Sequence, residues 1–236
     1  MDHSIELLSL TAVTIGFVHT ILGPDHYLPF VMLGKARDWS VRKTILITLF
    51  AGIGHVVGSV VLGLIGVGVG VSLFNLELIE AYRGDIAAWL LIAFGLVYMV
   101  ISIRNIRRKK KHIHMHHHID GTVHHHEHNH KNEHSHFHID DPMKSTPWVL
   151  FIIFVFGPCE PLIPVLMYPA AQGNPGNVIL VAVLFSLSTI ITMVAMVLTL
   201  RFGLSKINLG PVERYSHAIA GGVIMVSGMA IRFLGL

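Results

Sequence analysis

The sequence contains a single cysteine, Cys159, among 236 residues, and only 13% of its residues are charged. One cysteine excludes a disulfide within the chain and an exchange of electrons between two of its own thiols. Few charges combined with 53% hydrophobic residues exclude the usual composition of a soluble globular domain. The first residues also lack a basic segment, so we expect the first apolar run to remain as a helix and not to be removed as a signal peptide.

Long apolar runs fill most of the chain. About 20 helical residues cross a hydrocarbon core that is roughly 30 Å thick, and six runs approach or exceed that length. They lie at residues 5–22, 44–72, 86–103, 148–170, 177–200 and 217–235. The sequence therefore predicts an all-α polytopic membrane protein with six transmembrane helices.

Lysine and arginine residues lie almost entirely on one side of these spans. All except Arg83 and Arg232 follow the first, third or fifth span. Short basic loops are retained in the cytoplasm, so we expect a protein of the plasma or inner membrane with both termini outside and these three loops in the cytosol. The basic residues have no aromatic residues between them, which argues against a nucleic-acid partner and leaves the lipid bilayer as the expected surrounding.

Two stretches indicate an internal repeat. The sequence "GPDHYLPFVMLGKA" at 23–36 resembles "GPCEPLIPVLMYPA" at 157–170. Each half holds three spans, so the second copy is expected to be inverted in the membrane. Because glycine and proline both destabilise a helix, we expect the first helix of each half to be broken at its Gly-Pro pair. The predicted domains are a three-helix repeat at 1–103, a loop at 104–146 and a second three-helix repeat at 147–236.

Metal-binding side chains gather at both predicted breaks and in the second span. Such groups are costly in lipid and normally mark a functional pathway. Imidazoles with a carboxylate suit nickel, cobalt, zinc or iron better than magnesium or calcium. The predicted site consists of His19, Asp25, His26, His55, Cys159 and Glu160. Two alternatives stay open: a proton-carrying role for Glu160, and for His55 a hydrogen bond to a neighbouring helix.

A histidine-rich segment separates the two halves. Residues 109–140 hold 13 of the 18 histidines and show no apolar period, so this segment is expected to be flexible. We expect it to store, buffer or sense metal in the cytosol. Its candidate chelators are His116, His117, His118, His124, His125, His126, His128 and His130. A separate candidate chelator is His3 together with the N-terminal amine.

The motifs "HTILGPDH" and "GHVVG" resemble those of the nickel/cobalt transporter superfamily, most closely its urease-accessory-type permeases. The resemblance implies metal selection by His19, Asp25 and His26, with His55 joining them. It implies a transporter and not an enzyme, which moves nickel or cobalt, or else zinc or iron, by alternating access. The family favours uptake, with no obligatory cofactor and with cytosolic metallochaperones as partners. Five residues separate His19 from Asp25 where the best-known nickel permeases have four.

Three other functions remain open. An exporter of the same fold would use the histidine-rich loop to gather cytosolic metal. A membrane-anchored sensor or storage protein would use the loop alone and would leave the first-span histidines unexplained. The "GPC" at 157–159 also resembles membrane thiol-disulfide electron carriers of the cytochrome-maturation type, which share a 3+3 repeat. Those carriers need one cysteine in each half, and Asp25 stands where the other would be.

Overall fold

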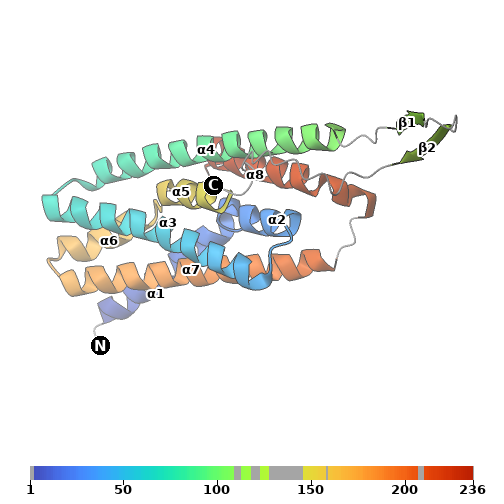
Figure 1. Ribbon diagram of the computed structural model, residues 1–236. Helices are drawn as coiled ribbons and strands as arrows, with labels where there is room; N and C mark the ends of the chain where they lie inside the picture. Colours follow the sequence, from blue (N-terminus) through green and yellow to red (C-terminus); the bar gives the residue numbers. More distant parts are fainter. Residues whose placement is uncertain are drawn as a thin grey trace.

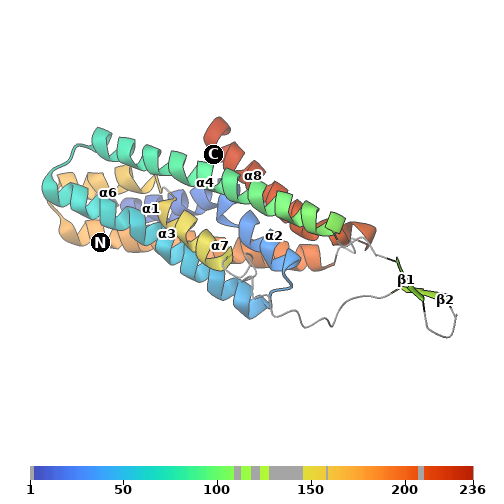
Figure 2. The ribbon, with the colours of Figure 1, turned by 45° about the horizontal axis from the view of Figure 1, so that its top comes forward.

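A computed structural model describes residues 3–108, 113–117, 123–127, 146–157, 159–206 and 210–235. This part of the chain forms a bundle of helices and a two-stranded hairpin (Figures 1 and 2). The helical elements are α1 (His3–Leu22), η1 (Pro24–His26), α2 (Leu28–Ala36), α3 (Val41–Val69), α4 (Leu73–Arg108), α5 (Thr146–Phe156), α6 (Leu162–Ala171), α7 (Pro175–Ser205), η2 (Gly210–Tyr215) and α8 (Ser216–Leu234). The predicted all-α class is confirmed for the bundle.

Five helical segments are long and apolar enough to cross a membrane: α1, α3, most of α4, α7 and the segment Val212–Leu234. The run at 148–170 is interrupted near its Gly-Pro pair, as predicted, and the short apolar helices α5 and α6 lie on either side of the break. The third apolar run, at 86–103, lies within the longer helix α4. Helix α4 continues to Arg108, since a helix can extend past the bilayer and arginine favours helix. Six spans and the inverted repeat stay predictions.

The first helix ends where its Gly-Pro pair predicts. Helix α1 stops at Leu22, Gly23 takes an extended conformation, and Pro24 opens the single 3-10 turn η1. An α-helix resumes only at Leu28, where α2 begins, because Tyr27 (φ −135°, ψ −35°) departs from helical geometry. The helix is therefore broken over several residues, which leaves room for polar side chains inside the bundle.

Helices from the two ends of the chain pack against each other in pairs. Helix α1 packs against α7, α3 against α5, and α4 against α8. Each pair joins a helix within residues 3–108 to a helix within residues 146–235. Helices α4 and α8 meet at Gly95 and Gly221: a Cβ on Gly95 would lie 2.4 Å from the Met225 nitrogen, and one on Gly221 would lie 2.6 Å from the Met99 nitrogen. Glycine thus lets the two backbones touch, as in other membrane helix pairs.

Apolar side chains lie both inside and outside this bundle. Two buried clusters form the core, one around Phe30, Phe154 and Met193 and the other around Leu162, Val181 and Phe185. Large apolar side chains are also exposed along the helices, among them Leu10, Ile65, Trp89, Ile191 and Phe233. A helix that is apolar on all sides suits lipid and not water.

The described part of the histidine-rich segment is a hairpin. Strands β1 (Ile113–His117) and β2 (Val123–Glu127) pair antiparallel, with His116 opposite His124 and Met115 opposite His125. The β-branched Ile113 and Val123 favour strand. The expected flexibility of the segment stays a prediction. The backbone positions of five candidate chelators fall in these strands: His116, His117, His124, His125 and His126. The other three, His118, His128 and His130, lie outside the described residues.

His3 lies at the start of α1. Its side chain is exposed and its Nδ1 lies 3.8 Å from Glu6 Oε2. Residues 1 and 2, which would complete the expected chelate at the N-terminus, lie outside the described residues. That expectation stays a prediction.

Candidate metal centre

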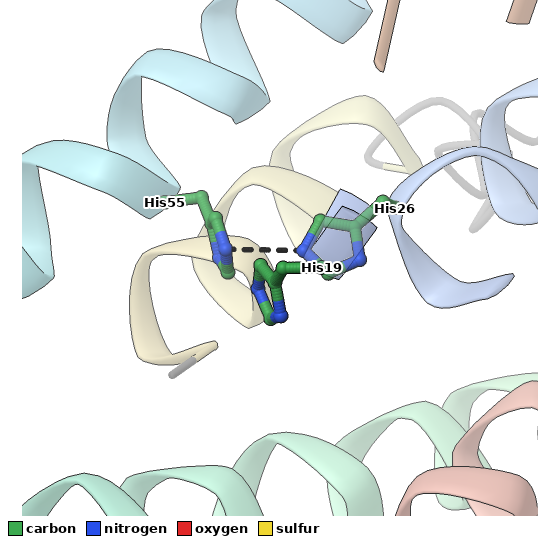
Figure 3. A group of neighbouring side chains, drawn as sticks. All are labelled: His19, His26 and His55. Carbon is green, nitrogen blue, oxygen red and sulfur yellow. Dashed lines mark hydrogen bonds between the residues drawn. The ribbon is translucent and has the colours of Figure 1, made fainter. Parts of the chain in front are cut away.

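Three histidines from different elements converge inside the bundle (Figure 3). His19 lies in the last turn of α1, His26 ends η1, and His55 lies in α3. One ring nitrogen of each lies within 4.8 Å of those of the other two, and no other such group occurs among the described residues. His26 and His55 are buried and His19 is partly buried. The structure therefore brings together three of the six residues predicted for the site as one group.

The rings of His26 and His55 are held by their Nδ1 atoms. His26 Nδ1 lies 3.1 Å from the Gly23 carbonyl oxygen and 3.1 Å from Asp25 Oδ1. His55 Nδ1 lies 3.3 Å from the Phe154 carbonyl oxygen. A ring nitrogen that faces a carbonyl donates its proton, so in the neutral ring the Nε2 atom keeps a free lone pair. Metal-binding histidines are typically oriented by such partners.

The two Nε2 atoms face each other. His26 Nε2 and His55 Nε2 lie 3.3 Å apart, as the dashed line in Figure 3 marks. Two nitrogens on one tetrahedral zinc ion, each at 2.0–2.1 Å, are about 3.3 Å apart. His19 Nε2 is buried and has no hydrogen-bond partner in the part of the chain that is described, which is costly. A shared proton would satisfy only one pair of nitrogens, whereas a metal ion accepts all three lone pairs.

Two glycines allow the rings to approach. A Cβ on Gly23 would lie 2.4 Å from His26 Nδ1, and a Cβ on Gly157 would lie 2.9 Å from His55 Nδ1. Each glycine belongs to one of the two helix breaks, so each break accommodates one histidine ring. Gly23 and Gly157 therefore lie at helix breaks and also leave space that a Cβ would fill.

Cys159 lies in the second break, directly beside His55. Its Sγ is 3.0 Å from His55 Nε2, and the side chain is buried and free of any disulfide. Cys159 is not part of the three-nitrogen group. As a thiol it donates to the His55 lone pair, and as a thiolate it would be a ligand beside that nitrogen.

The two predicted carboxylates take different places. Asp25 contacts His26 and orients it, and its oxygens are not part of the three-nitrogen group. Glu160 is exposed and lies on the wall of a cavity of about 400 Å³ that the histidines also line. The same wall includes Asp85 and Arg232, whose Oδ1 and Nε atoms are 3.5 Å apart. The structure thus places Glu160 near the site but not in it.

Three polar residues near Cys159 were not predicted as part of the site. The buried Glu80 and the partly buried Arg83 of α4 form an ion pair, and Ser59 of α3 donates to Glu80 Oε2 at 3.1 Å. Arg83 entered the prediction only as a charge that orients the spans. Opposite charges three residues apart inside an apolar helix were the signal that could have found the pair.

The apolar helices and the buried polar site define an integral, polytopic membrane protein. The family model described as "Cytochrome C biogenesis protein transmembrane region" matches residues 27–230. The chain belongs to this family. Neither the comparison with curated proteins nor that with solved structures gives a match.

This family corrects the prediction from the first-span motifs. Membership of the nickel/cobalt transporter superfamily is wrong, and the expectation of nickel or cobalt transport goes with it. A Gly-Pro break with nearby histidines is a local feature, whereas the family match extends over most of the chain. The resemblance of "GPC" at 157–159 to cytochrome-maturation carriers is confirmed at the level of the family. The side of the membrane on which the termini and loops lie stays a prediction.

Proposed function

We propose that this member of the family binds a transition-metal ion within the membrane, with His19, His26 and His55 as ligands. One observation carries the proposal: three imidazole nitrogens converge within 4.8 Å, and partners on the protein hold two of the rings by their other nitrogen. Imidazoles with a nearby thiol suit Zn²⁺ or Cu⁺. The protein binds the ion and is not an enzyme, and Asp25 orients His26.

The single cysteine, which lies at the second break, supports this proposal within the family. With one cysteine, the chain cannot pass electrons between two of its own thiols. Three converging imidazoles, two of them buried and one partly buried, are costly in a low-dielectric bundle without a cation and are stabilised by one. Metal binding therefore accounts for the polar residues that two-cysteine exchange leaves unexplained.

The test is the metal content of the purified full-length chain. After loading with Zn²⁺ and washing with a moderate chelator, we expect His26→Ala and His55→Ala each to lose about one ion per chain relative to the wild type. His217→Ala is the matched control, because His217 lies in α8 outside the three-nitrogen group, and it should keep the wild-type content. The histidine-rich segment is present in every variant, so its contribution cancels in the difference. Equal metal content in all four proteins would contradict the proposal.

A second candidate function is thiol-disulfide exchange at Cys159. The contact of its Sγ with His55 Nε2 at 3.0 Å supports it, because an adjacent imidazole can take the thiol proton. The Cys159 thiolate would attack a disulfide of a partner protein, bond to one sulfur and release the other as a thiolate. A second thiol of the partner would then release Cys159.

Mixed-disulfide trapping tests this candidate. Membranes quenched with acid should contain a Cys159-dependent adduct on a non-reducing gel, and Cys159→Ser should abolish it. The absence of any adduct in wild-type membranes would eliminate the exchange function. The burial of Cys159 in the described structure favours the metal site.

A further inference from the structure

The second helix break leaves backbone groups without helical partners inside the bundle. Helix α5 ends at Phe156 and α6 begins at Leu162, so carbonyls at the end of α5 and amides before α6 need other partners. In lipid no water is available to satisfy them, and each unsatisfied group costs several kcal/mol. The break therefore depends on side chains from other helices.

An ion pair of α4 supplies these partners. Arg83 donates from its Nη2 atom to the Val155 carbonyl at 2.9 Å and to the Gly157 carbonyl at 3.4 Å. The Cys159 amide donates to Glu80 Oε2 at 3.1 Å. Glu80 is fully buried and pairs with Arg83, so the two charges compensate each other.

Helix α3 holds Cys159 at two points. The Cys159 amide also lies 3.1 Å from Ser59 Oγ, while the Cys159 sulfur lies 3.0 Å from His55 Nε2. Ser59 follows His55 by four residues, so both lie on the same face of α3. Ser59 fixes the backbone of Cys159, and His55 contacts its side chain. Glu80 of α4 accepts hydrogen bonds from both Ser59 and the Cys159 amide, so it links α4 to α3 and to the second break.

We propose that Glu80 is a positioning residue that, with Ser59, holds Cys159 so that its thiolate becomes a fourth ligand of the ion bound by the three histidines. This inference rests on the proposed metal site. The thiolate carries the only negative charge that the ligand set would contain, so it would favour thiophilic ions over hard ones. Glu80 itself does not touch the ion.

Cd²⁺ is a suitable probe because it binds thiolates and gives a sulfur-to-metal charge-transfer band in the ultraviolet. Cys159 is the only cysteine, so this band cannot arise from the histidine-rich segment. We expect the Cd²⁺-loaded full chain to show the band and Cys159→Ser to lack it. A wild-type protein that binds Cd²⁺ through His55 but shows no band would overturn the inference and leave the proposed function intact. If the wild-type protein and His55→Ala bind the same amount of Cd²⁺, the proposed function itself would be overturned.

Paired substitutions test the role of Glu80 without leaving a buried charge unpaired. The double variant Glu80→Gln with Arg83→Gln keeps a carbonyl acceptor for the Cys159 amide, so the band should remain. Glu80→Leu with Arg83→Leu removes that acceptor, so the band should weaken and the affinity for Cd²⁺ should fall about 10- to 100-fold. Equal bands in the two variants would overturn the positioning role.

A smaller change covers the case in which the leucine pair does not fold. Ser59→Ala removes one acceptor of the Cys159 amide and alters little volume, so we expect a band that is shifted or weakened at unchanged His55-dependent Cd²⁺ binding. A band identical to that of the wild type in Ser59→Ala would count against the inference. Glu77→Gln, on the exposed side of α4, is the control and should leave the band unchanged.

Discussion

At the scale of single residues, two glycines control how closely the histidines approach. Gly23 and Gly157 occupy positions where a Cβ would meet the ring of His26 or of His55. A Cβ at either glycine would also disturb the hydrogen bond of the neighbouring ring. His26 Nδ1 faces the Gly23 carbonyl, and His55 Nδ1 faces the Phe154 carbonyl at the end of α5. The positions of the histidine rings therefore depend on these two glycines.

Gly157→Ala should displace His55 while leaving the bundle folded. The new Cβ would lie 2.9 Å from His55 Nδ1 and 3.1 Å from the Phe154 carbonyl oxygen, so it would disturb the bond between them. We expect the affinity for Zn²⁺ to fall about 10- to 100-fold, measured by competition with a chelating dye. Gly203→Ala is the control, since a Cβ there meets nothing within 4 Å. An unchanged affinity in Gly157→Ala would show that the ring orientation does not matter.

The residues of the site could be predicted only in part from the sequence. The cost of imidazoles in lipid identified His19, His26 and His55, and the structure brings them together. The same reasoning gave no place to Glu80, because its role depends on how α4 packs against the second break. That packing is a tertiary contact that no local pattern contains.

At the scale of helices, the breaks were predictable and the lengths were not. A Gly-Pro pair has a direct local effect, so both interrupted helices followed from the sequence. The length of α4 did not, because apolarity marks the part of a helix that lies in lipid and not the helix itself. The pairing of α4 with α8 also depends on glycines whose partners lie more than a hundred residues away.

Gly95→Ala should destabilise the pairing of α4 with α8. The added Cβ would lie 2.4 Å from the Met225 nitrogen and 2.6 Å from the Gly221 oxygen, and backbone atoms cannot move aside as a flexible side chain can. We expect the free energy of unfolding to fall by about 1–3 kcal/mol, with a lower thermal midpoint in detergent. Gly68→Ala in α3 is the control, because its Cβ meets nothing within 4 Å. A midpoint equal to that of the control would contradict the close contact of the two helices.

At the scale of the whole molecule, composition identified the class of protein and short motifs misidentified the family. The apolar runs and the few charges led directly to an integral membrane protein. The nickel/cobalt interpretation relied on motifs of a few residues around the first break, and those residues describe a site and not a fold. The family match covers residues 27–230, which include the second break and Cys159.

Orientation in the membrane is the prediction that belongs to the whole molecule. Lysine and arginine gather at the end where α4 and α7 finish, and the connection between α3 and α4 lies at the other end (Figure 1). The positive-inside rule therefore predicts that the α3–α4 connection faces outward and the end of α7 faces the cytosol. In a Cys159→Ser background, Ser72→Cys should react with a membrane-impermeant maleimide applied to intact cells, whereas Ser205→Cys should react only after the membrane is opened. Both positions are exposed at helix ends, so they form a matched pair. The reverse pattern would invert the orientation and would place the histidine-rich segment outside the cell, where it could not handle cytosolic metal.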